Sequence, residues 1–162
     1  MSSYDSYPAE LDLFLGGLLV TFGIFIILFA ILAYILTAII YYKTAQTNGL
    51  QDIAFWSWIP LLNVYVLFAL GSTKTTLEEI KKDAIKFTII YFALAIVSII
   101  PIIGFLASIA MMIIAIYYMY RILYRWTADS GKAILFVVLT FITGGLFFMI
   151  YGLIMMKKTF LA

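Results

Sequence analysis

Four apolar stretches without any Asp, Glu, Lys or Arg run through the chain, over residues 13–42, 53–71, 87–120 and 133–156. Each one reaches or exceeds the roughly 18 to 20 residues with which an α-helix spans the hydrocarbon core of a bilayer. The short polar segments between them carry most of the charge, and the remaining charged residues lie before the first stretch and after the last. This pattern predicts an all-α fold, a polytopic transmembrane bundle of four to five helices.

The same pattern predicts a single integral membrane domain over residues 1–162. The first stretch is 30 residues long, more than one perpendicular crossing needs, and we interpret it as one long helix that tilts or extends beyond the core. The third stretch is longer still and is best divided into two helices. The expected helices cover about 12–42, 53–71, 76–100, 103–126 and 132–157.

A proline and a glycine interrupt the third stretch near its middle, in Ile100-Pro101-Ile102-Ile103-Gly104. Proline ends a helix because its ring removes an N–H donor and clashes with the preceding turn, and glycine allows a tight reversal. We therefore expect a helical hairpin at Pro101 to Gly104. A single kinked helix is the competing interpretation, because lipid-embedded helices tolerate proline where neighbours satisfy the freed carbonyl.

The second stretch combines helix-breaking, polar and aromatic residues, namely Trp56, Trp58, Pro60, Asn63 and Tyr65. We expect it to break at Pro60, and it either crosses the membrane or enters and returns on the same side. Re-entrant backbone is stable only where protein or water covers it. An unpaired amide in hydrocarbon costs several kcal/mol in order of magnitude, so Asn63 should bond the broken backbone or a facing helix. These five residues are also the candidate ligand or path site.

Most basic residues cluster in two loops, and cytoplasmic loops of membrane proteins carry the excess of Lys and Arg. The cytoplasmic flank is expected to be Lys74, Lys81, Lys82, Lys86, Arg121, Arg125 and Lys132. Loops 72–86 and 121–132 are then cytoplasmic and the C-terminus is external. The N-terminus is cytoplasmic if the second stretch crosses, and external if it re-enters.

The composition excludes most catalytic chemistry. The chain is 66% hydrophobic and 11% charged, and it contains no Cys and no His. Thiolate nucleophiles, imidazole acid–base chemistry and sulfur or imidazole metal sites are therefore absent. No ionisable residue lies inside the apolar stretches, whereas proton relays and ion paths normally use one. We expect no enzyme, no catalytic residue, no metal and no cofactor.

The expected partners are membrane lipids and other membrane proteins, including further copies of the chain. The net charge of +2 is too small and too dispersed for a nucleic-acid surface. Glycines on the first and last helices could permit close helix packing, because a missing side chain lets two backbones approach. The candidate packing residues are Gly16, Gly17, Gly23, Gly144, Gly145 and Gly152.

The segment Asn48-Gly49-Leu50 followed by Phe55-Trp56-Ser57-Trp58-Ile59-Pro60-Leu61-Leu62-Asn63-Val64-Tyr65 resembles a family of small multipass prokaryotic membrane proteins of unknown function. The Trp-x-Trp-Ile-Pro-x-x-Asn-x-Tyr pattern is its most specific part, and Gly131-Lys132 resembles the family's turn before the last helix. The resemblance covers about residues 40–156. Leu50 stands where that family has a tryptophan. The resemblance implies the cell membrane of a bacterium or archaeon, and no established activity.

Three functions are compatible with these observations. The first is a non-enzymatic membrane protein that acts by association, as an accessory or scaffold subunit, an immunity-type protein or a self-assembling bundle. The second is a small channel or transporter for an uncharged solute or a cation, with its path near Pro60 and Asn63. The third, a lipid-modifying enzyme, would have to use surface residues such as Glu78, Asp83, Arg121, Arg125 or Asp129.

Overall fold

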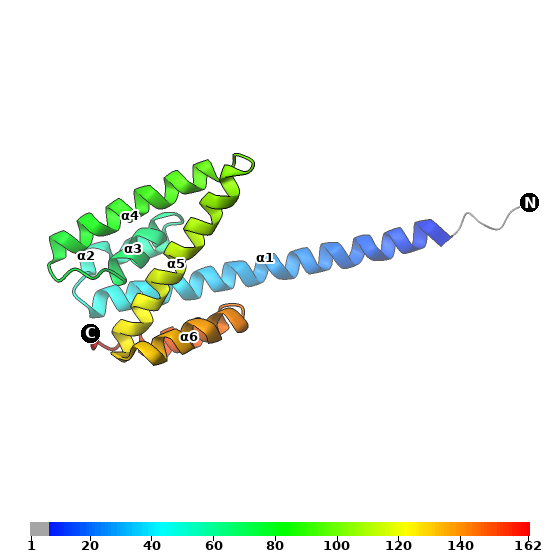
Figure 1. Cartoon of the computed structure of the whole chain (residues 1–162). Coiled ribbons are helices and arrows are strands. Elements are labelled where there is room, and N and C mark those ends of the chain that lie inside the picture. Colours follow the sequence, from blue (N-terminus) through cyan, green and yellow to red (C-terminus); the bar gives the residue numbers. More distant parts are fainter. Residues whose placement is uncertain (1–6) are drawn as a thin grey trace, which may run out of the picture. The chain divides into compact units, whose positions relative to one another are not determined.

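The computed structural model of the chain describes residues 7–162, and within them the regular structure is entirely helical. It comprises seven α-helices and one short 3₁₀-helix over the described range (Figure 1). The elements are α1 Tyr7–Thr47, α2 Gln51–Ala54, the 3₁₀-helix η1 Phe55–Trp58, α3 Leu62–Leu70, α4 Leu77–Val97, α5 Ile103–Thr127, α6 Ser130–Ile142 and α7 Leu146–Met155.

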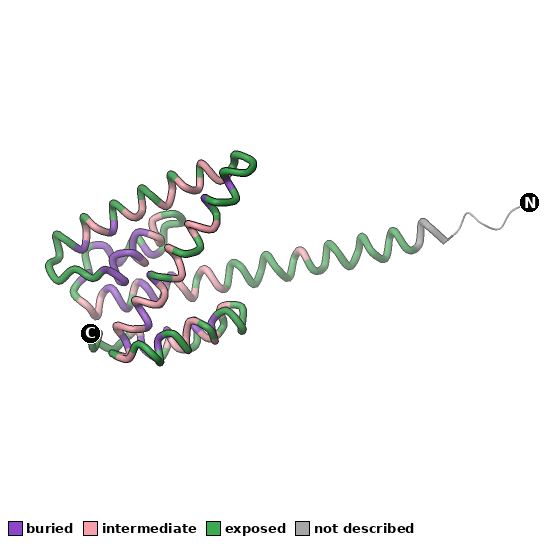
Figure 2. The backbone as a smooth tube through the Cα atoms, viewed as in Figure 1, coloured by how far each residue is buried: buried purple, intermediate pink, exposed green. Residues whose placement is uncertain are grey.

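The chain divides into two compact units, one ending at Ile35 and one covering Leu36–Ala162. The first consists of the N-terminal part of α1, where the large apolar residues from Leu11 to Leu32 are exposed. The backbone of this part is coloured almost entirely as exposed in Figure 2. Helix α1 is longer at both ends than the expected 12–42. It ends where Gly49 adopts a φ of 80° and the Leu50 N–H bonds the Ala45 carbonyl at 2.9 Å. This arrangement satisfies a terminal carbonyl, and glycine adopts the left-handed conformation without strain.

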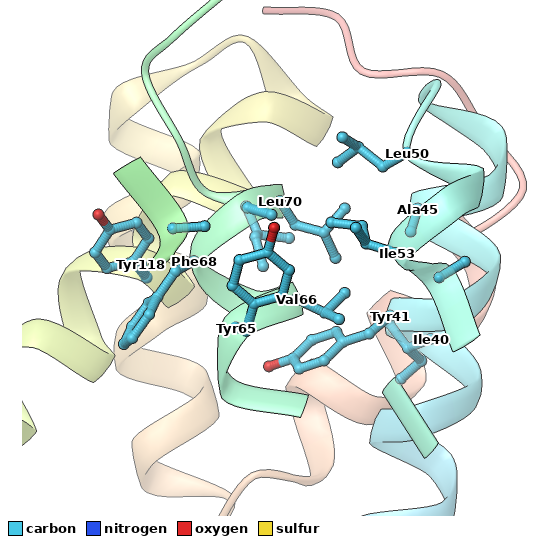
Figure 3. Packing of buried hydrophobic residues seen from close by; sticks show 14 of the residues in the cluster. Ile40, Tyr41, Ala45, Leu50, Ile53, Tyr65, Val66, Phe68, Leu70 and Tyr118 are labelled. Carbon is cyan, nitrogen blue, oxygen red and sulfur yellow. The ribbon is translucent and has the colours of Figure 1, made fainter. Parts of the chain in front are cut away.

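The second unit holds the hydrophobic core. Its centre is formed by the end of α1, by α3 and by the last turns of α5, where Ile40, Val66, Phe68, Ile122 and Leu123 are fully buried. Figure 3 shows side chains of α1 and α3 meeting there, with Tyr118 beside Phe68. The two rings lie 4.5 Å apart between centroids. Burial is therefore concentrated where α1 and α5 end and α4 begins.

Helices α4 and α5 form the hairpin that the proline and glycine predict, so the single kinked helix is wrong (Figure 1). The chain reverses over residues 98–102. A Cβ atom on Gly104 would lie 2.3 Å from the Ser98 carbonyl oxygen, so only glycine allows this close approach of the two arms. Thr76 begins α4 as its N-cap and accepts a hydrogen bond from the Glu79 N–H.

The break predicted at Pro60 is also observed. The chain turns at residues 59–61, and the rings of Trp56 and Tyr65 lie 5.2 Å apart across the turn. The start of this segment lies near the N-terminal end of α4, and its end lies near the C-terminal end of α5. Asp52 forms an ion pair with Lys81 near the start of α4, and the Leu70 carbonyl accepts a hydrogen bond from Arg125 near the end of α5. The segment is a helical hairpin, which we call the first short hairpin (residues 51–70).

The expectation of one helix over 132–157 is wrong. Helices α6 and α7 are separated by a turn in which Gly144 and Gly145 have φ values of 60° and 93°. The Phe136 ring lies 5.0 Å from Phe147 and 4.8 Å from Tyr151, so the two helices run antiparallel. At about 1.5 Å per residue, the 13 residues of α6 and the 10 of α7 each extend only about 20 Å or less. This is the second short hairpin (residues 130–155).

Candidate functional site

The ten basic residues of the chain all lie at one end of the second unit, which we call the basic end (residues 43–52, 71–86, 121–132 and 156–162). Hydrogen bonds and ion pairs connect these segments. Five carboxylates also lie there, so the net charge of the basic end is +5. The remainder of the unit contains no Asp, Glu, Lys or Arg. The seven basic residues predicted to share one side are thus joined by Lys43, Lys157 and Lys158.

Two arginines on one face of α5 donate hydrogen bonds to carbonyl groups at the C-terminal end of α3. Arg125 Nη1 donates to the Leu70 carbonyl at 2.7 Å, and Arg121 Nε donates to the Gly71 carbonyl at 3.3 Å. The last carbonyls of a helix have no partner within it and carry partial negative charge, so cationic donors stabilise them. The sequence indicates both residues as basic, but their contact with α3 depends on the packing of α5.

The C-terminal segment also packs against the basic end. Leu161 N–H donates to the Arg125 carbonyl at 2.7 Å, and Phe160 N–H donates to Asn48 Oδ1 at 2.7 Å. The Phe160 ring lies 4.0 Å from the Arg125 guanidinium carbon, and Arg125 Nε donates to the Ala162 oxygen at 3.3 Å. The C-terminal segment and residues 72–75 therefore lie at the same end of the second unit, whereas the prediction placed them on opposite sides of the membrane. The prediction relied on one membrane-crossing helix over residues 132–157 between the two segments. The structure has the second short hairpin at this position.

A cavity of about 320 Å³ opens between these segments, which we call the polar cavity. It contains three cationic side chains and no carboxylate side chain. A second cavity of about 280 Å³ shares Thr73 and Lys74 with it and adds Asp83, Lys86 and Tyr117. The polar cavity is lined by Asn48, Ser72, Thr73, Lys74, Thr75, Ile80, Arg121, Arg125 and Ala162.

The cations of the polar cavity are not neutralised by acidic partners. Among residues 11–162, whose side chains the structure describes, the ion pairs are Lys81 with Asp52, and Lys132 with Asp129 at 3.7 Å. The nearby Asp83 accepts a hydrogen bond from the Ser72 hydroxyl at 3.3 Å. Lys74, Arg121 and Arg125 thus form a cluster of cations in which none makes an ion pair with an acidic side chain of the described residues.

The candidate path residues around Pro60 make contacts within the turn and with neighbouring helices. Asn63 Nδ2 donates to the Ser57 carbonyl at 3.3 Å, which confirms that the amide bonds the broken backbone. Tyr65 is buried, whereas Trp56 and Trp58 are partly exposed at 40% and 39%. The Trp58 ring lies 6.3 Å from that of Tyr42 on α1, so the aromatic residues face different neighbours.

The candidate packing glycines have three different environments. A Cβ on Gly152 would lie 2.9 Å from Ile40 Cδ1, so this glycine does permit close contact between α7 and α1. Gly144 and Gly145 form a turn, so the expectation that they pack helices together is wrong. A Cβ on Gly16, Gly17 or Gly23 would meet no atom within 4 Å. The packing glycine that sequence reasoning missed is Gly71, where a Cβ would lie 2.7 Å from Tyr118.

An apolar groove of about 460 Å³ runs between α5 and α6, and Tyr117 belongs to both this groove and the second cavity. Among the described residues no group of three or more acidic side chains could hold a metal ion. Helix α1 from Leu11 and helix α5 are long and apolar enough to cross a membrane. The groove is lined by Ile113, Ile116, Tyr117, Tyr120, Ile134, Val137 and Val138.

No protein-family model, no curated protein and no solved structure matches the chain. The resemblance over residues 40–156 therefore stays a prediction.

Proposed function

We propose that the protein is a multipass membrane protein in which α1, α4 and α5 cross the bilayer and both short hairpins enter from the basic end and return. Helix α5 has 25 residues, about 38 Å at 1.5 Å per residue, against a hydrocarbon core of about 30 Å. Helices α3, α6 and α7 are far shorter. The uncharged part of α4, residues 87–97, is also short, and α4 is proposed to cross because it is the antiparallel partner of α5 in their hairpin. Their turns would then lie within the membrane. Because residues 59–61 and most of 141–146 are exposed in this chain, the proposal requires that a second protein molecule or water covers them.

The basic end is assigned to the cytoplasm, since Lys and Arg near helix ends favour that side. The C-terminal segment contacts Arg125 and is therefore placed in the cytoplasm as well, and the start of α1 is placed outside. The resemblance to prokaryotic proteins supports the cell membrane of a bacterium or archaeon as the location.

Single cysteine variants test this topology cleanly, because the chain has no cysteine of its own. In intact cells a membrane-impermeant maleimide should label Ile99→Cys, in the turn between α4 and α5. Thr75→Cys and Ser130→Cys should react only after the membrane is opened. Leu146→Cys, at the turn of the second short hairpin, should react slowly in both cases. Fast external labelling of Leu146→Cys would contradict the re-entrant hairpin.

The proposed activity is non-enzymatic association with another membrane protein or with a second copy of the chain, through α1. The observation that carries it is the uncovered glycine surface of this helix. Gly16 and Gly23 are seven residues apart and share a helix face, and a Cβ on either would meet no atom within 4 Å. Membrane helices associate through such small residues because backbones can approach closely there.

The test is the intact mass of the assembly in lipid nanodiscs prepared from cells that express the tagged protein. We expect a mass several times 18.3 kDa, or a co-purifying protein in constant ratio. Gly16→Leu combined with Gly23→Leu should abolish the complex. Phe25→Leu, on the opposite face of α1 by helical periodicity, is the matched control and should retain it.

A monomer in every preparation, with no co-purifying protein, would overturn the association proposal. Retention of the complex by the double glycine variant would show that α1 does not provide the contact. Circular dichroism of each variant would establish that helical content is unchanged.

A further inference from the structure

The polar cavity combines three features that a solvated collar of surface charges does not require. Its cations come from two separate parts of the chain, the loop after α3 and the last turns of α5. No carboxylate side chain lines it. Its volume of about 320 Å³ lies at the lower end of the range of small-ligand sites.

The hydrogen bonds of the two arginines do not neutralise their charge. The Leu70 and Gly71 carbonyls that accept from them are uncharged, and Arg125 also donates to the Ala162 oxygen. Most of the guanidinium N–H donors have no acceptor among residues 11–162. Arg121 and Arg125 are four residues apart on α5, and like charges at this spacing repel each other. An anion between them and Lys74 would remove that repulsion.

Lys74 and Arg121 are the residues best placed to bind such an anion. Arg125 already donates to Leu70 and Ala162 and stacks on Phe160, so its role is mainly structural. Within the described residues the Lys74 ammonium group makes no ion pair. The Lys74 backbone N–H is fixed by the Ser72 hydroxyl at 3.2 Å, which holds the loop beside the cavity.

We propose that the polar cavity is a binding site for a phosphate group, held by Lys74 and Arg121 with the hydroxyls of Thr73 and Thr75 as further donors. The planar guanidinium matches two oxygens of a phosphate, and the ammonium acts as a point charge beside it. The group belongs either to an anionic phospholipid or to a soluble phosphate compound. The apolar groove that meets Tyr117 is suited to an acyl chain.

Native mass spectrometry of the full chain in an uncharged detergent tests the site with four probes. These are short-chain phosphatidic acid, phosphatidylglycerol, phosphatidylcholine and inorganic pyrophosphate. We expect one saturable site for an anionic probe and much weaker binding of phosphatidylcholine. Retention of the anionic lipids alone would identify a lipid headgroup site, and displacement by pyrophosphate would identify a soluble phosphate site.

The variants Lys74→Gln and Arg121→Gln should each weaken binding about tenfold or more, since a charge-assisted hydrogen bond is lost. The matched control is Lys82→Gln, because Lys82 is an exposed cation of the basic end that lines neither cavity. The Lys82→Gln variant should bind the anionic probes with the same affinity as the original chain. Lys74→Gln loses no intramolecular ion pair, so its thermal unfolding should be unchanged.

Equal affinity of Lys74→Gln and the original chain for every anionic probe would overturn the proposal. So would the absence of a saturable anionic site at physiological salt, or binding of phosphatidylcholine as tight as that of the anionic lipids. Each outcome is independent of the assembly mass, so failure of this site and failure of the association through α1 are distinguishable.

Discussion

Leu61 and Ile102 adopt the same unusual backbone conformation, 41 positions apart in the chain. Each directly follows a proline and begins the second arm of a hairpin, with φ values of 75° and 70°. The hydrogen bonds also correspond, from Asn63 N–H to the Ile59 carbonyl and from Gly104 N–H to the Ile100 carbonyl. The chain therefore uses one turn twice, to reverse at Pro60 and at Pro101.

This conformation strains a residue that carries a side chain, by about 1 to 3 kcal/mol. Leu61→Gly and Ile102→Gly should therefore stabilise the protein or leave it unchanged, since both side chains are largely exposed, at 67% and 85%. The matched control is Ile99→Gly, which is 80% exposed and has no positive φ, and it should destabilise. Chemical unfolding in detergent micelles measures the difference. Destabilisation by all three variants alike would contradict the strain.

Two glycines at close contacts should not tolerate a methyl group. Gly104→Ala places a Cβ 2.3 Å from the Ser98 carbonyl oxygen, so the α4–α5 hairpin must open, and we expect a loss of several kcal/mol. Gly152→Ala meets the flexible end of Ile40, so its loss should be smaller, about 1 to 3 kcal/mol. Gly16→Ala meets no atom within 4 Å and serves as the control. Equal unfolding midpoints for the three variants would refute these contacts.

Asn63 holds the first short hairpin by its bond to the Ser57 carbonyl. Asn63→Ala should lower the free energy of unfolding by about 1 to 3 kcal/mol, because it leaves the buried Ser57 carbonyl without its partner. Hydrogen exchange should increase at residues 57–66 and remain unchanged in α5. An unchanged exchange rate with altered solute flux would instead favour a path at Pro60.

Ser57 is fully buried and its hydroxyl has no hydrogen-bond partner among the described residues. An unpaired buried hydroxyl costs free energy, so Ser57→Ala should stabilise the protein by about 1 kcal/mol. Ser108→Ala is the matched change, because that hydroxyl does bond the Gly104 carbonyl at 2.9 Å. It should be neutral or destabilising. A fall in the thermal midpoint for Ser57→Ala would show that the hydroxyl is satisfied.

Asp129 should make stability depend on acid pH. It is the N-cap of α6, and the Lys132 backbone N–H that its carboxylate accepts holds its pKa below the usual range. Because its pKa is lowered in the folded state, the Asp129 carboxylate stabilises the folded protein at pH values above its unfolded-state pKa of about 3.9. This stabilisation is lost as the pH falls through the pKa of the folded state. Asp129→Ala should therefore lower the thermal midpoint at pH 7 and have little effect at the acid limit.

Asp129→Asn is the control for this titration, because asparagine also caps a helix but its side chain carries no charge that depends on pH. Its thermal midpoint should lack the acid step that the carboxylate produces. An equal deficit of Asp129→Ala at every pH would show that the carboxylate does not titrate with folding.

Local chemistry explains which features could be predicted. The absence of charge over long stretches indicates helices, and a proline with a nearby glycine indicates a reversal, as at Pro101 and Gly104. The break at Pro60 and its amide partner follow from the same reasoning. The turn at Gly144 and Gly145 was missed because paired glycines occur both in membrane helices and in turns, and only their φ values separate the two cases.

The sequence by itself determined that the chain is helical, that it breaks at Pro60 and at Pro101, and that its charge lies outside the apolar stretches. The tertiary structure decided that all ten basic residues lie at the basic end of the second unit. It also decided that Arg121 and Arg125 donate hydrogen bonds to the carbonyls at the C-terminal end of α3. Arg125 and Leu70 are 55 positions apart, and helical periodicity reports only neighbours within a few residues. Contacts over such separations depend on how α5 packs against α3, which no local pattern encodes.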